Sequence, residues 1–201
     1  NSVYCFEDGT APDENPNLTR WREGELIPVY FLNVEDSRFT YAMNKAEDLV
    51  GYQLFDRNGV IHLDISDINS IDYSGLETKW GFIWSQGTSP GDCSSGTVSV
   101  GPMTSNIVSH SVGLDYGINQ PVGNTFSWIN IDSGSSTPQA GCTTVASNEV
   151  TLHELGHALG MSNHFDGFGN GAAFNNNAER VLRTMYNNPH GQPFDALSIA
   201  L

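Results

Sequence analysis

Residues 147–164 read SNEVTLHELGHALGMSNH, and residues 147–160 of this stretch are the clearest helix in the chain. Ser147 is a suitable N-cap residue, and Val150 would be the first apolar residue on the inward face of the helix. Residues four apart lie on the same face of a helix, so His153 and His157 can offer their imidazole nitrogens to one ion. We therefore expect a helix that carries two metal ligands.

Glu154 follows the first of these histidines and would lie beside the bound ion. There its carboxylate can take a proton from a water that attacks a peptide carbonyl, and pass it to the leaving amine. A chain with six His matches His-Glu-x-x-His by chance in about one case in a hundred. The residues after the motif make it more specific: Gly160 can end the helix at positive φ, so that the chain turns back towards the metal with a third ligand.

Further along, RTMYN at 183–187 predicts a tight turn that contains Met185, shortly before Pro189. With these features the sequence resembles the metzincin clan of zinc peptidases, and most closely its secreted, matrixin-like bacterial members. The motif of that clan is His-Glu-x-x-His-x-x-Gly-x-x-His, and a "Met-turn" lies beneath the zinc. The residues that match are His153, Glu154, His157, Gly160 and, at the Met-turn, Met185. The resemblance implies that Met185 is a hydrophobic floor and not a ligand; for Tyr186 we prefer a packing role.

The third ligand departs from the pattern of the clan. Asn163 stands where the third His is expected, and His164 comes one residue later. Imidazole is a better zinc ligand than an amide oxygen, and a turn can absorb one extra residue. We therefore expect His164 to be the third ligand. Asp166 and Glu179 are the alternatives, and Glu179 would correspond to a thermolysin-like scheme.

The rest of the chain predicts an α+β fold in which a mixed, twisted sheet carries two long helices on one face. Apolar spacing predicts a helix within 37–55, which would end before a turn at 56–59. We expect strands at 26–33, 60–65, 80–84, 126–131 and part of 97–112. A shorter helical turn is expected at 178–182.

The length of 201 residues fits one catalytic domain. Residues 1–20 would be an extended arm and residues 21–160 an upper lobe with the sheet and both helices. Residues 161–201 would form a small, irregular lower lobe with the Met-turn. This arrangement is the metzincin-like fold that the resemblance implies.

The formal charge of −15, from 8 basic and 23 acidic residues, disfavours nucleic acid and anionic membranes as partners. No apolar run is long enough to span a bilayer. The chain begins at Asn1, which fits a mature form whose targeting segment has been removed. We expect a secreted monomer that acts on a protein or peptide.

Cys93 and Cys142 lie in Gly/Ser/Thr-rich loops, and we expect a disulfide between them. Cys5 is then left over; a bond to either of the others is the alternative. In matrixins an upstream Cys can close the zinc site of the zymogen, which suggests the same role for Cys5, although YCFEDG does not reproduce the inhibitory motif of the family. Calcium could bind the oxygen-rich segments 64–69 and 166–170, but neither matches an EF-hand.

Three functions remain to be weighed. The leading one is a zinc endopeptidase with Glu154 as its proton acceptor. The others are a catalytically inactive extracellular module that keeps the zinc, and a purely structural zinc site, which usually has four protein ligands.

Overall fold

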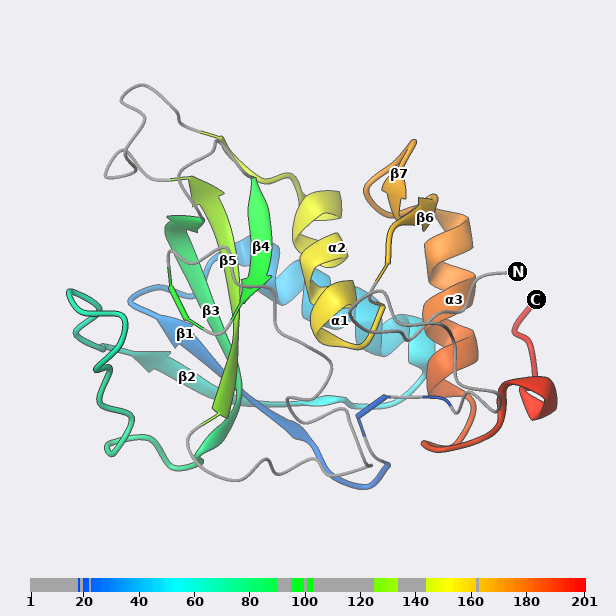
Figure 1. The fold of residues 1–201 in the computed structure, drawn as a ribbon, viewed down its shortest axis with the longest axis horizontal. Helices are drawn as coiled ribbons and strands as arrows, with labels where there is room; N and C mark the ends of the chain where they lie inside the picture. The colour runs from blue at the N-terminus through cyan, green and yellow to red at the C-terminus, as the bar shows by residue number, and fades with distance from the viewer. Residues whose placement is uncertain are drawn as a thin grey trace.

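A five-stranded mixed sheet forms one layer of the protein, and the first two helices lie on one of its faces, while the third lies beyond them, away from the sheet (Figure 1). The computed structural model describes residues 18, 20–21, 23–89, 95–99, 101–102, 125–133, 144–161 and 163–201. The sheet contains β1 (Ile27–Leu32), β2 (Phe55–Ile61), β3 (Trp80–Ser89), β4 (Gly96–Ser99) and β5 (Thr125–Ser133). The helices are α1 (Ser37–Val50), α2 (Asn148–Ala158) and α3 (Asn176–Tyr186), and the short elements are β6 (Phe165–Asp166), β7 (Gly169–Asn170) and the 3₁₀ turn η2 (Phe194–Ala196). The prediction of an α+β fold with a mixed sheet is confirmed.

The strand order is β2-β1-β3-β5-β4. Every pairing is parallel except that of β4, which runs antiparallel to β5 at the edge of the sheet. Helix α1 connects the parallel strands β1 and β2 across one face. The segment 62–79 connects β2 to β3 and covers the other face, on the side away from the helices (Figure 1).

Each face of the sheet has its own apolar cluster. The cluster on the helix side is the larger and joins the sheet to all three helices, with Phe31, Trp84, Phe39, Leu155 and Leu182 among its buried members. The smaller cluster, on the other face, is centred on Tyr30, Ile83 and Trp128 and packs against side chains from 61–76. The alternation of side chains along the strands explains why neighbouring residues such as Ile83 and Trp84 belong to different clusters.

Helix α1 follows its sequence pattern closely. Asp36 caps its N-terminus by accepting a hydrogen bond from the backbone N–H of Arg38, and Gly51 ends it in the left-handed region at φ 83°. The turn predicted at 56–59 is wrong, because these residues lie inside β2. The register of β2 against β1 shifts at this point, and Gly59 has φ 86°, so a bulge in the outermost strand accommodates the turn-like sequence.

The other strands differ from the sequence prediction mainly in length. β5 contains the predicted stretch 126–131, whereas β3 continues five residues beyond the predicted end at Trp84. The strand predicted at 60–65 begins earlier, at Phe55, and ends at Ile61. Part of the edge strand expected within 97–112 is present as β4; residues 103–112 lie outside the described residues.

The C-terminal part is more regular than predicted. Helix α3 has 11 residues where the sequence predicted a turn over 178–182, and Asn175 caps it by accepting from the N–H of Asn177. The tight turn predicted around Met185 is also wrong. Met185 lies in the last turn of α3, and the chain leaves the helix only at Asn187, since Pro189 restricts the residue before it and not the residues three or four positions earlier.

Arg20 joins the beginning of the described chain to its end. Its guanidinium is buried and donates to the carbonyls of Tyr186 and Asn188 at 2.8 and 3.0 Å, and to the Tyr52 hydroxyl at 2.9 Å. Of the arm predicted over 1–20, only residues 18 and 20 are described, and both are buried. In the described part of the chain, no helix is long and apolar enough to cross a membrane.

Candidate metal centre

Helix α2 carries three of the predicted site residues on its buried side. Ser147 is its N-cap, and the hydroxyl accepts from the N–H of Val150 at 3.2 Å. Ala158 is its last residue, and Gly160 follows at φ 112°, the positive φ that the sequence predicted. The chain then turns back, so that the residues after Gly160 lie beside the last two turns of α2.

The turn brings a third imidazole to the two on the helix. The Nε2 atoms of His153 and His157 are 3.0 Å apart, and the Nε2 atom of His164 lies 3.1 Å from the first and 3.2 Å from the second. Within the described residues, this is the only group of three His, Cys, Asp or Glu side chains close enough to share an ion. The structure therefore juxtaposes His164 with the helical pair, as the sequence predicted.

The backbone fixes which nitrogen of each helical histidine faces the others. Nδ1 of His153 is 2.9 Å from the carbonyl oxygen of Ala173, and Nδ1 of His157 is 2.7 Å from that of Met161. A carbonyl can only accept, so each Nδ1 atom carries a proton, and a neutral ring held in this way turns its Nε2 lone pair inward. Burial also lowers the pKa of His153 to about 4, which keeps this ring neutral at pH 7.

The donor set suits zinc. Inward lone pairs at such distances repel one another unless a cation lies among them. Zinc binds imidazole at about 2.0–2.1 Å, and tetrahedral angles then place the nitrogens about 3.3 Å apart. The observed separations of 3.0–3.2 Å need only a small outward movement to match.

Glu154 is the most strongly perturbed acid of the described residues. The residue is 7% exposed, and burial raises the pKa of the carboxyl to about 8. Its neighbour across the cleft is Gly96 of β4: a Cβ atom at this position would lie 2.6 Å from Cγ and 2.8 Å from Oε1 of Glu154. The missing side chain at Gly96 therefore makes the room in which the carboxyl sits.

These groups line one cleft of about 380 Å³ between β4 and α2. Its walls are formed by Gly96, Thr97, Val98, Glu154, Asn163 and the three histidines. The edge strand and the imidazoles thus face the same space. Asn163, which holds the position of the third His in the clan, lines the cleft beside His164 without belonging to the imidazole group.

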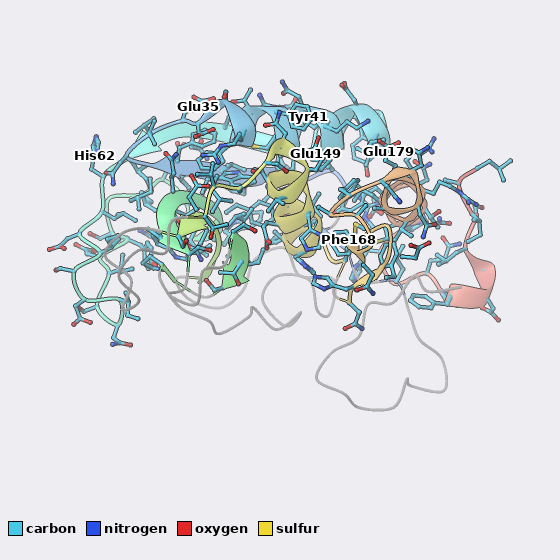
Figure 2. The ribbon with its side chains drawn as sticks, turned by 90° about the horizontal axis from the view of Figure 1, so that it is seen from above. Glu35, Tyr41, His62, Glu149, Phe168 and Glu179 are labelled. Atoms are coloured by element: carbon cyan, nitrogen blue, oxygen red, sulfur yellow. The ribbon has the colours of Figure 1, made fainter. Side chains whose placement is uncertain are left out.

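The rival ligands lie elsewhere. Glu179 is on α3, where its carboxylate pairs with Lys45 of α1 at 2.7 Å. In Figure 2 it lies apart from α2 and from the adjacent loop that contains Phe168. Asp166 is exposed and is not part of the imidazole group.

Tyr186 has the packing role that the sequence favoured: it is buried, and its hydroxyl donates to the carbonyl of Leu159 at 2.9 Å. Met185 is buried in the main apolar cluster.

The remaining site predictions fall on other parts of the chain. Cys5, Cys93 and Cys142 lie outside the described residues, and so does the expected disulfide. In the segment 64–69, Asp64 accepts from the N–H of Ser66 and Asp67 from that of Asn69, so these carboxylates close local turns. Calcium binding there and at 166–170 stays a prediction.

Two features that shape the site were not singled out in the sequence. Gly96 carried a weak signal, because a glycine inside a strand often marks a close approach of another group. Phe168, buried against the imidazoles, stands in a Gly/Asn-rich stretch with no recognisable pattern. No protein-family model matches the chain, and comparisons with curated proteins and with solved structures gave no match.

Proposed function

We propose that this protein is a zinc-dependent endopeptidase with a metzincin-like fold, and that it acts outside the cell. The observation that carries the proposal is the convergence of three imidazole Nε2 atoms within 3.0–3.2 Å beside a buried carboxyl group. His153, His157 and His164 would hold the ion, and three protein ligands leave room for solvent or substrate, as in catalytic zinc sites.

Glu154 would do the proton chemistry. A zinc ion in this position supplies Lewis acidity, which polarises a peptide carbonyl and makes water more acidic. The carboxylate of Glu154 takes a proton from the attacking water and delivers it to the leaving nitrogen. Burial alone raises the pKa of this group to about 8, and a nearby cation favours the carboxylate form and so lowers the pKa again.

β4 would bind the substrate. It is the outermost strand next to β5, and its residues Gly96, Thr97 and Val98 line the cleft. An extended peptide could add to this edge through main-chain hydrogen bonds, which would bring a carbonyl of the peptide to the imidazoles. Such binding favours protein or peptide substrates and is consistent with a monomeric enzyme.

The alternatives are less well supported. A thermolysin-like scheme needs Glu179 at the metal, whereas this carboxylate pairs with Lys45. An inactive zinc-binding module or a structural zinc site has no need for a buried carboxyl group beside the imidazoles, since such a group costs stability when it ionises.

Cleavage of casein by the zinc-loaded protein tests the proposal. We expect cleavage that a chelator abolishes and zinc restores. Glu154→Gln should lose nearly all activity, because the amide accepts no proton, while it still binds one zinc ion per chain. Zinc binding without cleavage in the wild type would support the inactive module instead.

A further inference from the structure

Phe168 lies against the imidazoles from the protein side. It is in the loop between β6 and β7, beside α2 (Figure 2), and its side chain is 0% exposed. The centroid of its ring is 4.2 Å from that of His153, 4.8 Å from that of His157 and 6.0 Å from that of His164. One aromatic ring thus contacts every member of the group.

The loop holds this ring firmly. The backbones of Phe165 and Phe168 exchange two hydrogen bonds, of 2.9 and 2.8 Å, and their rings stack at 5.2 Å. Phe174 meets the ring edge-on at 5.9 Å. On the helix side, Gly156 leaves room for it: a Cβ atom there would lie 2.8 Å from Cε2 of Phe168.

The glycine that follows Phe168 serves the third imidazole in the same way. Gly169 has φ 75°, and a Cβ atom there would lie 2.5 Å from Cδ2 of His164. His164 therefore packs directly on the backbone next to the Phe168 ring. The loop contacts all three imidazoles through the Phe168 ring and, at His164, also through the backbone of Gly169.

These contacts restrict the tilting of the imidazole rings that their hydrogen bonds still allow. His153 and His157 are each tied to a carbonyl through Nδ1, but a ring held only by its bond to Cβ and one hydrogen bond can still tilt. The ring of Phe168, packed against both of these imidazoles, opposes the tilt on the protein side. Metal affinity depends on such supporting contacts, because rings that are already oriented lose less freedom when they bind the ion.

We propose that Phe168 is a positioning residue of the metal centre, and that its ring is the apolar floor on which the three imidazoles rest. The resemblance to the metzincin clan implies such a role for Met185. The inference rests on the proposed zinc site but not on peptide cleavage.

Zinc affinity of the full chain tests it. Competition with a chromophoric chelator should show that Phe168→Leu raises the zinc Kd by tenfold or more, in the range of about 10- to 100-fold typical of supporting residues. Phe55→Leu is the matched control, since Phe55 is equally buried in the same cluster but its ring contact is with Phe82. It should lose comparable thermal stability and keep the wild-type Kd.

A second variant approaches the ring from the other side. Gly156→Ala removes no contact and favours the helix, but its methyl group should displace Phe168 and again raise the zinc Kd. The visible spectrum of the Co²⁺ form should change in both variants and stay unchanged in Phe55→Leu.

The results can be told apart. A wild-type Kd and spectrum in folded Phe168→Leu and Gly156→Ala would overturn this inference while leaving the zinc site intact. A wild type that binds no zinc would overturn the proposed function and the role of Phe168 with it.

Discussion

Gly96 illustrates how one absent side chain can shape the candidate site. Because a Cβ atom here would lie 2.6 Å from Glu154, the substitution Gly96→Ala should push the carboxyl group away from the imidazoles. A misplacement of this kind costs about a hundredfold in activity, so we expect a loss of that order in kcat with zinc content unchanged. Gly75→Ala is the control, since nothing lies within 4 Å of a Cβ atom at that position. Full activity in Gly96→Ala would contradict this role.

The proposed role of His164 as the third ligand can be tested in the same direct manner. His164→Ala should lose most of its zinc at a concentration that saturates the wild type, because two imidazoles alone hold zinc weakly. Glu179→Ala should keep its zinc and lose only the contact with Lys45. Metal analysis after dialysis distinguishes the two variants. The opposite pattern would favour the thermolysin-like scheme.

The junction of α1, β5 and α2 depends on a network of charges around Arg38. Its guanidinium pairs with Asp36 and with Asp132, both at 2.8 Å, and donates to the carbonyl of Ala146 shortly before α2. Hydrogen bonds to Arg38 lower the pKa of Asp36. At Asp132, burial acts to raise the pKa of the carboxyl group. The hydrogen bonds from Arg38 and from the N–H of Ala146 outweigh this effect, so the pKa of Asp132 is lowered as well. The network connects the start of α1 to the chain that leads into α2.

Arg38→Gln should therefore destabilise the fold in a pH-dependent way. Both carboxyl groups have lowered pKa values, so their contribution is present above the unfolded value of 3.8 and is lost as the pH falls through the folded values. The wild type should exceed the variant by about 2–3 kcal/mol in unfolding free energy near pH 7. Urea titrations from pH 7 down to 2.5 should show this difference shrinking below pH 4. A constant difference would argue against the network.

This network also shows what the sequence could not reveal. The spacing of apolar residues in α1 and the four-residue interval between His153 and His157 are local patterns, so both helices were predictable. The pairing of Arg38 with Asp132 joins residues 94 apart, and no local pattern encodes it. Helix α3 was underestimated because polar residues such as Asn175 suggest a loop, although here Asn175 is the helix cap.

Zinc should stabilise the whole protein as well as the cleft. The three imidazoles come from α2 and from the loop that follows it, and they meet only when the chain is folded. A ligand that binds only the folded state adds about 2.7 kcal/mol at a concentration of 100 times its Kd. For a domain of this size, that corresponds to a rise in Tm of about 5–10 °C. Calorimetry with zinc or with a chelator measures the rise, which His164→Ala should lose; equal Tm values in the wild type would contradict the coupling.

The most direct test is an anomalous-scattering map of the crystallised protein at the zinc edge. We predict one peak, within bonding distance of the Nε2 atoms of His153, His157 and His164, with Glu154 close by but not bound and no fourth protein side chain on the ion. A map without that peak, or an ion enclosed by a fourth side chain in the active form, would contradict the assignment of a catalytic zinc site.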